Sequence, residues 1–82
     1  MIDVPQANGD QLTAPPFWTG IIIDSRPAAL FVCPNAHTVM LSYDYDVDRL
    51  GYVQPQISCK VLHCGFQKHV RLTGWRSWLE SL

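Results

Sequence analysis

The chain has 82 residues, of which 48% are hydrophobic and 16% are charged, and its net charge is −1 at pH 7. This length allows one small domain, and such domains often depend on a metal ion, disulfides or a partner chain for stability. The composition excludes a wholly disordered chain. The pI of about 6.2 argues against a strongly basic nucleic-acid-binding module.

Residues 1–16 are expected to form an extended tail outside the folded domain. Three prolines and an Asn-Gly pair interrupt this segment, and no helical or strand periodicity runs through it. Its few apolar side chains offset little of the entropy lost on ordering. We therefore expect the tail to lie in a groove of a neighbouring chain. The first residues have no Lys or Arg and no apolar run, so they do not resemble a secretory signal.

Residues 17–82 are expected to form the domain, with short strands followed by one helix. Aromatic and β-branched residues favour strands. We expect strands at 17–24, 28–32, 38–43, 51–57 and 68–72. Apolar residues with the spacing of one helical face predict a short helix over 75–82, which is stable only when it docks. No segment approaches the roughly 18 apolar residues of a membrane span.

All three cysteines and two of the three histidines lie in two short predicted turns. Cys33 and His37 flank the first turn, and Cys59 and Cys64 flank the second. An odd number of cysteines without a signal peptide argues against a disulfide framework and favours reduced thiols or metal ligands. One tight turn supplies two ligands, so two facing turns supply the four of a zinc tetrahedron. The sequence predicts a structural zinc site at these four residues, with His63 as an alternative ligand.

Other interpretations of the same residues are open. Cys59 and Cys64 could form a disulfide, or the three thiols could be ordinary core residues. Cys59 and His63 have the spacing of a thiolate–imidazole pair, and a site with three protein ligands would leave room for water on the metal. Because no orienting carboxylate lies nearby in the sequence, we predict no catalytic residues and a non-enzymatic protein.

At these turns the sequence resembles the zinc-ribbon group of small β domains, in which two facing knuckles hold the metal. It also resembles a set of short uncharacterised bacteriophage proteins. Those proteins carry Cys-Pro-Asn-x-His-Thr, then Cys-x4-Cys-Gly-Phe and Gly-Trp, and the matching residues here are 33–38, Cys59, 64–66 and 74–75. The resemblance implies a small, mostly β, zinc-ribbon-like fold of antiparallel hairpins with a structural zinc ion, but no activity. The spacings of three and four residues within the two pairs depart from the Cys-x-x-Cys knuckle.

Tryptophans and basic residues give two candidate surfaces. The tryptophans are either core residues that cover the metal hairpin or interface anchors, because tryptophan is enriched at binding hot spots. The candidate interface residues are Trp18, Trp75, Trp78 and Leu82. The net charge is −4 before residue 58 and +3 from there onward, so the basic end is either a solvated strand face or a candidate nucleic-acid surface. Its cations are Lys60, Lys68, Arg71 and Arg76.

The sequence as a whole predicts a structural or interaction protein, encoded by a phage and part of a larger assembly such as a virion. The low charged fraction favours a surface that is partly covered by other proteins. Its partners would be proteins of that assembly, and it would be found in the virion or the host cytoplasm. The alternative is a small regulatory protein that binds a host protein or nucleic acid, and a metal-dependent enzyme is a remote third interpretation.

Overall fold

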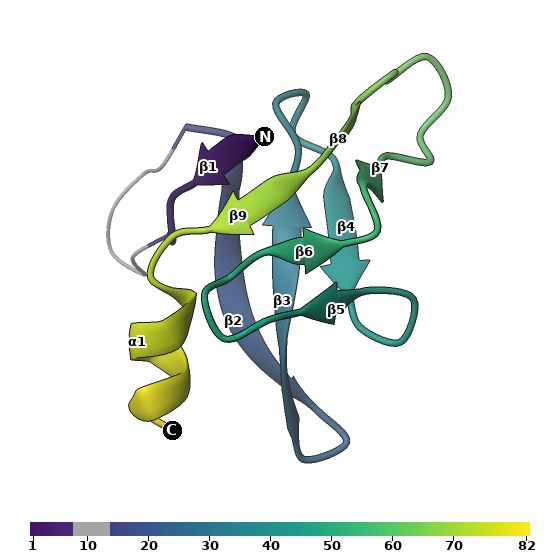
Figure 1. Cartoon of the computed structure of the whole chain (residues 1–82). Coiled ribbons are helices and arrows are strands. Elements are labelled where there is room, and N and C mark those ends of the chain that lie inside the picture. Colours follow the sequence, from purple (N-terminus) through teal and green to yellow (C-terminus); the bar gives the residue numbers. More distant parts are fainter. Residues whose placement is uncertain (8–13) are drawn as a thin grey trace.

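The computed structural model describes residues 1–7 and 14–82, which form nine short strands and one helix (Figure 1). The strands are β1 (Ile2–Val4), β2 (Phe17–Ile23), β3 (Arg26–Val32), β4 (Thr38–Leu41), β5 (Asp46–Val47), β6 (Val53–Gln54), β7 (Ile57–Ser58), β8 (Gln67–Lys68) and β9 (Val70–Leu72), and the helix is α1 (Trp75–Glu80). The predicted mostly β chain with antiparallel hairpins and a C-terminal helix is confirmed. These residues form no helix long and apolar enough to cross a membrane.

The three longest strands form one antiparallel sheet in the order β2-β3-β4. Asp24 and Ser25 both have positive φ, which is the geometry of a tight two-residue hairpin between β2 and β3. Trp18, Phe31 and Val39 stand opposite one another across the three strands. Trp18 and Phe31 are completely buried, so this row of the sheet faces the core.

The other strands and α1 form a second layer that lies over one face of this sheet (Figure 1). β1 pairs with β9, β5 with β6, and β7 with β8. The core lies between the two layers. Its buried members are Val4, Trp18, Ala29, Phe31, Cys33, Leu41, Val53, Ile57, Phe66, Val70, Leu72 and Trp75. Trp75 and Trp78 of α1 pack edge-on or tilted against Trp18 and each other, with centroid separations of 5.2–6.1 Å, so the helix is docked as expected.

The N-terminal segment belongs to the domain. β1 pairs in parallel with β9, with Ile2 opposite Val70 and Val4 opposite Leu72. Val4 is completely buried, and its carbonyl accepts a hydrogen bond of 2.9 Å from the Thr73 amide. The prediction that residues 1–16 form a separate tail held by a neighbouring chain is therefore wrong for residues 1–7. Backbone hydrogen bonds and the burial of alternate apolar side chains offset the conformational entropy that this segment loses when it becomes ordered. The sequence alone does not indicate this pairing. Residues 8–13 lie outside the described part.

Two predicted strands are each divided in the structure. The segment 51–57 becomes β6 and β7, because Pro55 has no amide to donate to a ladder and lies between them. The segment 68–72 becomes the end of β8 and β9, which pair with different partners, β7 and β1. Gly51 has a φ of 95° and its carbonyl accepts a hydrogen bond from the Leu72 amide at 2.7 Å, so β6 and β9 meet there.

Candidate metal centre

The first turn of the site follows the end of β3. The Cys33 amide donates to the His37 carbonyl at 2.9 Å, and the Ala36 amide donates to the Cys33 carbonyl at 2.8 Å. Ala36 adopts a φ of 65°, which closes the turn tightly. Cys33 is completely buried and His37 is half-buried. The closed turn thus fixes both side chains next to each other at the edge of the core.

The second turn joins β7 to β8. The Cys59 amide donates to the Phe66 carbonyl and the Cys64 amide donates to the Val61 carbonyl, both at 3.0 Å. Gly65 has a φ of 68°, a conformation in which glycine carries no steric penalty. Cys59 and Cys64 are half-buried and pack against the core. This turn presents its two thiols toward the first turn.

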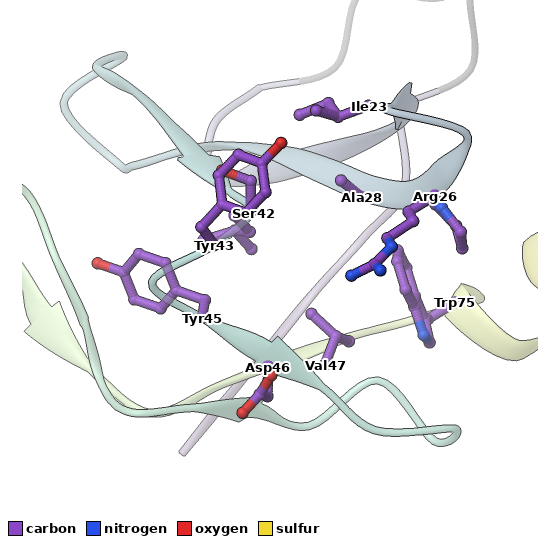
Figure 2. A pocket seen from close by; sticks show the side chains of 11 residues that line it. Ile23, Arg26, Ala28, Ser42, Tyr43, Tyr45, Asp46, Val47 and Trp75 are labelled. Atoms are coloured by element: carbon purple, nitrogen blue, oxygen red, sulfur yellow. The ribbon is translucent and has the colours of Figure 1, made fainter.

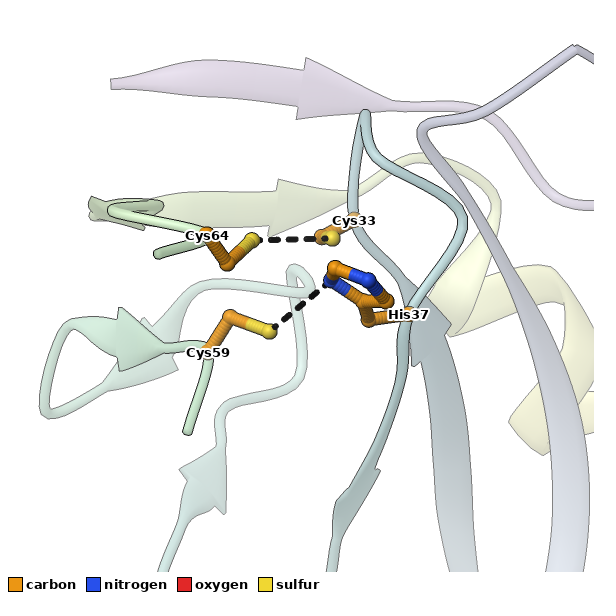
Figure 3. A group of neighbouring side chains, drawn as sticks. All are labelled: Cys33, His37, Cys59 and Cys64. Atoms are coloured by element: carbon orange, nitrogen blue, oxygen red, sulfur yellow. Dashed lines mark hydrogen bonds between the residues drawn. The ribbon is translucent and has the colours of Figure 1, made fainter. Parts of the chain in front are cut away.

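The two turns face each other and bring four side chains together (Figure 3). The Sγ atoms of Cys33 and Cys64 are 3.6 Å apart, and the Sγ of Cys59 is 3.6 Å from Nδ1 of His37. All four ligand atoms lie within 4.8 Å of one another, so these residues are close enough to hold a metal ion. The alternative ligand His63 is exposed and is not a member of this group. The three cysteines are free thiols, so the structure does not contain the alternative disulfide.

Asn35 gives the Cys64 sulfur a polar environment that the sequence analysis missed. Its Nδ2 donates to the Cys64 Sγ at 3.3 Å and to the Cys64 carbonyl at 3.4 Å. The hydrogen bond from Asn35 is the largest cause that lowers the pKa of the Cys64 thiol, to about 6, and a hydrogen bond from the Phe66 backbone is the next largest. An asparagine in a tight turn usually forms a hydrogen bond with its own backbone. Nothing in the sequence therefore indicates that Asn35 donates to the second turn.

Cys59 differs from Cys64 in its protonation. A hydrogen bond from the Val61 backbone lowers the pKa of Cys59, but partial desolvation and the neighbouring thiols of Cys64 and Cys33 outweigh it, and the pKa is raised from its usual value. One thiol of the second turn is therefore poised as a thiolate near neutral pH, while the other ionises only at alkaline pH.

The comparisons with known proteins do not assign the chain to a family. No protein-family model, curated protein or solved structure matches the chain. The four-residue cluster is therefore the main feature from which a function can be inferred.

The structure corrects the assignment of two predicted interface residues. Trp18 is completely buried and Trp75 is 4% exposed, so both are core residues and neither offers its ring to a partner. The Trp18 indole also donates to the Thr73 carbonyl at 2.9 Å. Trp78 is half-buried over Gly20, and Leu82 is exposed. The three tryptophan rings pack against one another, with Trp78 on the outer side of the cluster.

The four predicted nucleic-acid-binding cations do not form one free basic surface. Arg71 pairs with Asp3 at 3.7 Å, and Arg76 pairs with Glu80 at 3.1 Å. Lys60 lies in the loop between β7 and β8, at the opposite end of the molecule from α1, which carries Arg76 (Figure 1).

A cavity of about 330 Å³ lies near the β2–β3 hairpin, at the end of β3 away from the cysteines (Figure 2). It is lined by Ile23, Arg26, Pro27, Ala28, Leu41, Ser42, Tyr43, Tyr45, Asp46, Val47 and Trp75. The Tyr43 hydroxyl donates to the Asp24 carboxylate, which raises the pKa of Tyr43. Among the described residues of the lining, Asp46 is the one carboxylate and none is a cysteine or a histidine. The cavity thus supplies neither the carboxylate pair nor the thiol–imidazole pair that hydrolytic catalysis uses.

Proposed function

We propose that the protein binds one zinc ion through Cys33, His37, Cys59 and Cys64. Thiolate and imidazole ligands suit zinc better than magnesium or calcium, which prefer oxygen ligands. With Zn–S bonds of about 2.3 Å and Zn–N bonds of about 2.0–2.1 Å, tetrahedral geometry separates neighbouring ligand atoms by roughly 3.4–3.8 Å. The Cys33–Cys64 and Cys59–His37 separations of 3.6 Å fall in that range.

The zinc ion has a structural role in this proposal. A set of three thiolates and one imidazole closes the tetrahedron and leaves no position for a substrate. β7 and β8 are paired over two residues each, with Ile57 opposite Lys68 and Ser58 opposite Gln67. So short a hairpin is marginal by itself. A metal shared with Cys33 and His37 would tie its loop to the end of β3 and so stabilise this end of the domain.

The protein is, in this proposal, a non-enzymatic structural or interaction protein within a larger assembly. The resemblance to short bacteriophage proteins suggests a virion as that assembly. The closed ligand set supports the non-enzymatic role. Several large apolar side chains are exposed, among them Leu62 at 81% and Met40 at 54%, and contacts with other proteins would cover them. The ion pairs of Arg71 and Arg76 make the nucleic-acid alternative less favoured.

Cobalt(II) substitution tests both the ligand set and the closed coordination. We expect one cobalt per chain, with the intense visible absorption of a tetrahedral thiolate site. His37→Ala should change this spectrum, and His63→Ala, the matched control, should leave it unchanged. Added azide should not alter the spectrum of the unsubstituted protein, because no coordination position is open. A weak spectrum of higher coordination, or a shift on adding azide, would instead favour an open site and with it the enzyme interpretation.

A further inference from the structure

The thiols of Cys33 and Cys64 are placed to react with each other as well as to bind a metal. Their Sγ atoms lie 3.6 Å apart, although the two residues are 31 positions apart in the chain. Cys33 follows β3, and Cys64 lies in the loop between β7 and β8. The S–S bond of a disulfide is about 2.05 Å long, so the two sulfurs need to approach by about 1.5 Å. Rotation about the Cα–Cβ bonds moves sulfur atoms through distances of this size.

Contacts between protein atoms hold Cys64 beside the first turn without help from a metal ion. Nδ2 of Asn35 donates to the Cys64 sulfur at 3.3 Å and to the Cys64 carbonyl at 3.4 Å, and Asn35 belongs to the same turn as Cys33. Cys59 is placed differently, because its sulfur lies 3.6 Å from Nδ1 of His37 (Figure 3). The second turn therefore presents one thiol to a thiol and the other thiol to an imidazole.

An oxidant reaches this pair from the side of the second turn. Cys33 is completely buried, whereas Cys59 and Cys64 are half-buried. Peroxides oxidise accessible thiolates to sulfenic acids, which condense with a neighbouring thiol to form a disulfide. Cys64 is thus the thiol that is attacked, and Cys33 is the thiol that resolves it. A disulfide first formed at Cys59 passes to the Cys33–Cys64 pair by thiol–disulfide exchange, since the three sulfurs lie within 4.8 Å of one another.

The reaction with hydrogen peroxide balances in two steps. The Cys64 thiolate attacks one peroxide oxygen, the O–O bond breaks, hydroxide leaves, and Cys64 becomes a sulfenic acid. The Cys33 thiolate then attacks the Cys64 sulfur, forms the S–S bond and expels a second hydroxide. Two protons from solvent convert the two hydroxides to water. The two thiolates together lose two electrons, and the peroxide gains them.

We propose that peroxide converts the candidate metal centre into a Cys33–Cys64 disulfide, which releases the zinc ion and takes over its role of joining the two turns. The release of zinc rests on the proposed function, whereas the disulfide itself does not. His37 and Cys59 remain after oxidation, and two ligands are fewer than the four that hold a structural zinc ion. The disulfide joins the turn after β3 to the loop between β7 and β8. A Cys59–Cys64 disulfide would lie within that loop and would make no such connection.

Peroxide treatment of the zinc-loaded full chain, followed by peptide mass mapping without reductant, tests this proposal. Trypsin cleaves after Arg49 and Lys60, so the three cysteines lie on separate peptides. We expect the peptides of Cys33 and Cys64 to be linked and Cys59 to remain open to alkylation. A chromophoric chelator should detect one zinc released per disulfide. Dithiothreitol with added zinc should restore the zinc-loaded protein.

Thermal unfolding tests whether the disulfide replaces the metal. The oxidised, zinc-free protein should melt on the order of 10 °C above the chelated, reduced protein, because the disulfide closes a loop of about 30 residues. Cys59→Ser keeps the reacting pair, so oxidation should raise its melting temperature by a similar amount. Cys33→Ser is the matched control, and oxidation should raise its melting temperature far less, since any disulfide it forms lies within one loop.

A link between Cys59 and Cys64, or zinc release without any disulfide, would overturn the proposal. An oxidised protein that melts like the chelated, reduced protein would also overturn it. Failure of the zinc proposal is a separate result. A protein that contains no zinc but forms the Cys33–Cys64 disulfide would contradict the proposed function and support the disulfide.

Discussion

The side-chain amide of Asn35 lies 3.3 Å from the Cys64 sulfur and so connects the two turns of the candidate metal site. Asn35 belongs to the turn after β3, whereas Cys64 belongs to the loop between β7 and β8. Hydrogen bonds to a ligand's donor atom orient it and stabilise its ionised form. In the zinc proposal, Asn35 is therefore a supporting residue for the four ligands.

Replacing Asn35 should weaken metal binding without changing its stoichiometry. Asn35→Ala removes a donor to the Cys64 thiolate, and loss of such supporting contacts typically lowers metal affinity by about 10–100-fold. Competition with a chromophoric chelator measures the change. The control is Gln54→Ala, an exposed amide on β6, which should bind zinc as tightly as the unsubstituted protein. Equal affinities for the two variants would show that the Asn35 contact has no effect on the site.

The metal-free protein should show different pH profiles for its two half-buried thiols. The lowered pKa of Cys64 means that its thiolate persists until the pH falls through about 6, whereas the raised pKa of Cys59 keeps that thiol protonated at neutral pH. Cys64 should therefore be alkylated several-fold faster than Cys59 at pH 7. Mass spectrometry after short iodoacetamide pulses measures both rates, and Asn35→Ala should move the Cys64 profile to higher pH. Faster labelling of Cys59 at pH 7 would contradict this assignment.

The same shift has a consequence for stability. The folded-state pKa of Cys64 lies below its usual value, so the ionised thiol stabilises the fold fully only above that usual value. This stabilisation is lost as the pH falls toward 6. In the metal-free protein, Cys64→Ser should therefore flatten the fall in stability between alkaline pH and pH 6, as followed by urea unfolding at several pH values.

The four residues of the candidate site were predictable from the sequence because each pair is set by a local turn. Cys33 and His37 lie in one tight turn, and Cys59 and Cys64 in another, so the spacing alone places each pair. The central sheet was predictable for a similar reason, since runs such as Ile21–Ile23 favour strands. The pairing of β1 was not predictable, because its partner β9 lies near the other end of the chain. A three-residue strand has too little periodicity to indicate a contact over that distance.

The N-terminal strand should contribute to the stability of the isolated domain. Val4 is completely buried between β9 and the core, so Val4→Ala should lower the free energy of unfolding by roughly 2 kcal/mol. Urea denaturation of the zinc-loaded protein measures the effect. Met1→Ala, at a position that is 74% exposed, is the control and should change stability by less than about 0.5 kcal/mol. If Val4→Ala is as stable as the control, β1 does not belong to the core in solution.

Gly51 and Gly74 both have positive φ, and replacing Gly51 by alanine should cost more stability than replacing Gly74. A Cβ atom at Gly51 would collide with the backbone carbonyl of Leu72, which cannot move without disturbing β9. At Gly74 the nearest atom is the flexible Gln6 side chain at 3.4 Å, so alanine there meets mainly the cost of the left-handed backbone, about 1–2 kcal/mol. Gly51→Ala should therefore be less stable than Gly74→Ala by roughly 2 kcal/mol in urea unfolding. Equal losses would argue against the close approach of β6 and β9.

The most direct test of the zinc proposal is thermal unfolding of the protein before and after removal of its metal. Elemental analysis should find about one zinc per chain, and chelation should lower the melting temperature markedly or abolish cooperative melting, because zinc binding supplies folding free energy. Adding zinc to the chelated protein should restore the original transition, and adding magnesium should not. The Cys59→Ser variant should melt like the chelated protein, and the His63→Ala variant should melt like the zinc-loaded protein. A metal-free protein with the same folded spectrum and the same melting temperature would contradict the claim that Cys33, His37, Cys59 and Cys64 hold a structural zinc ion.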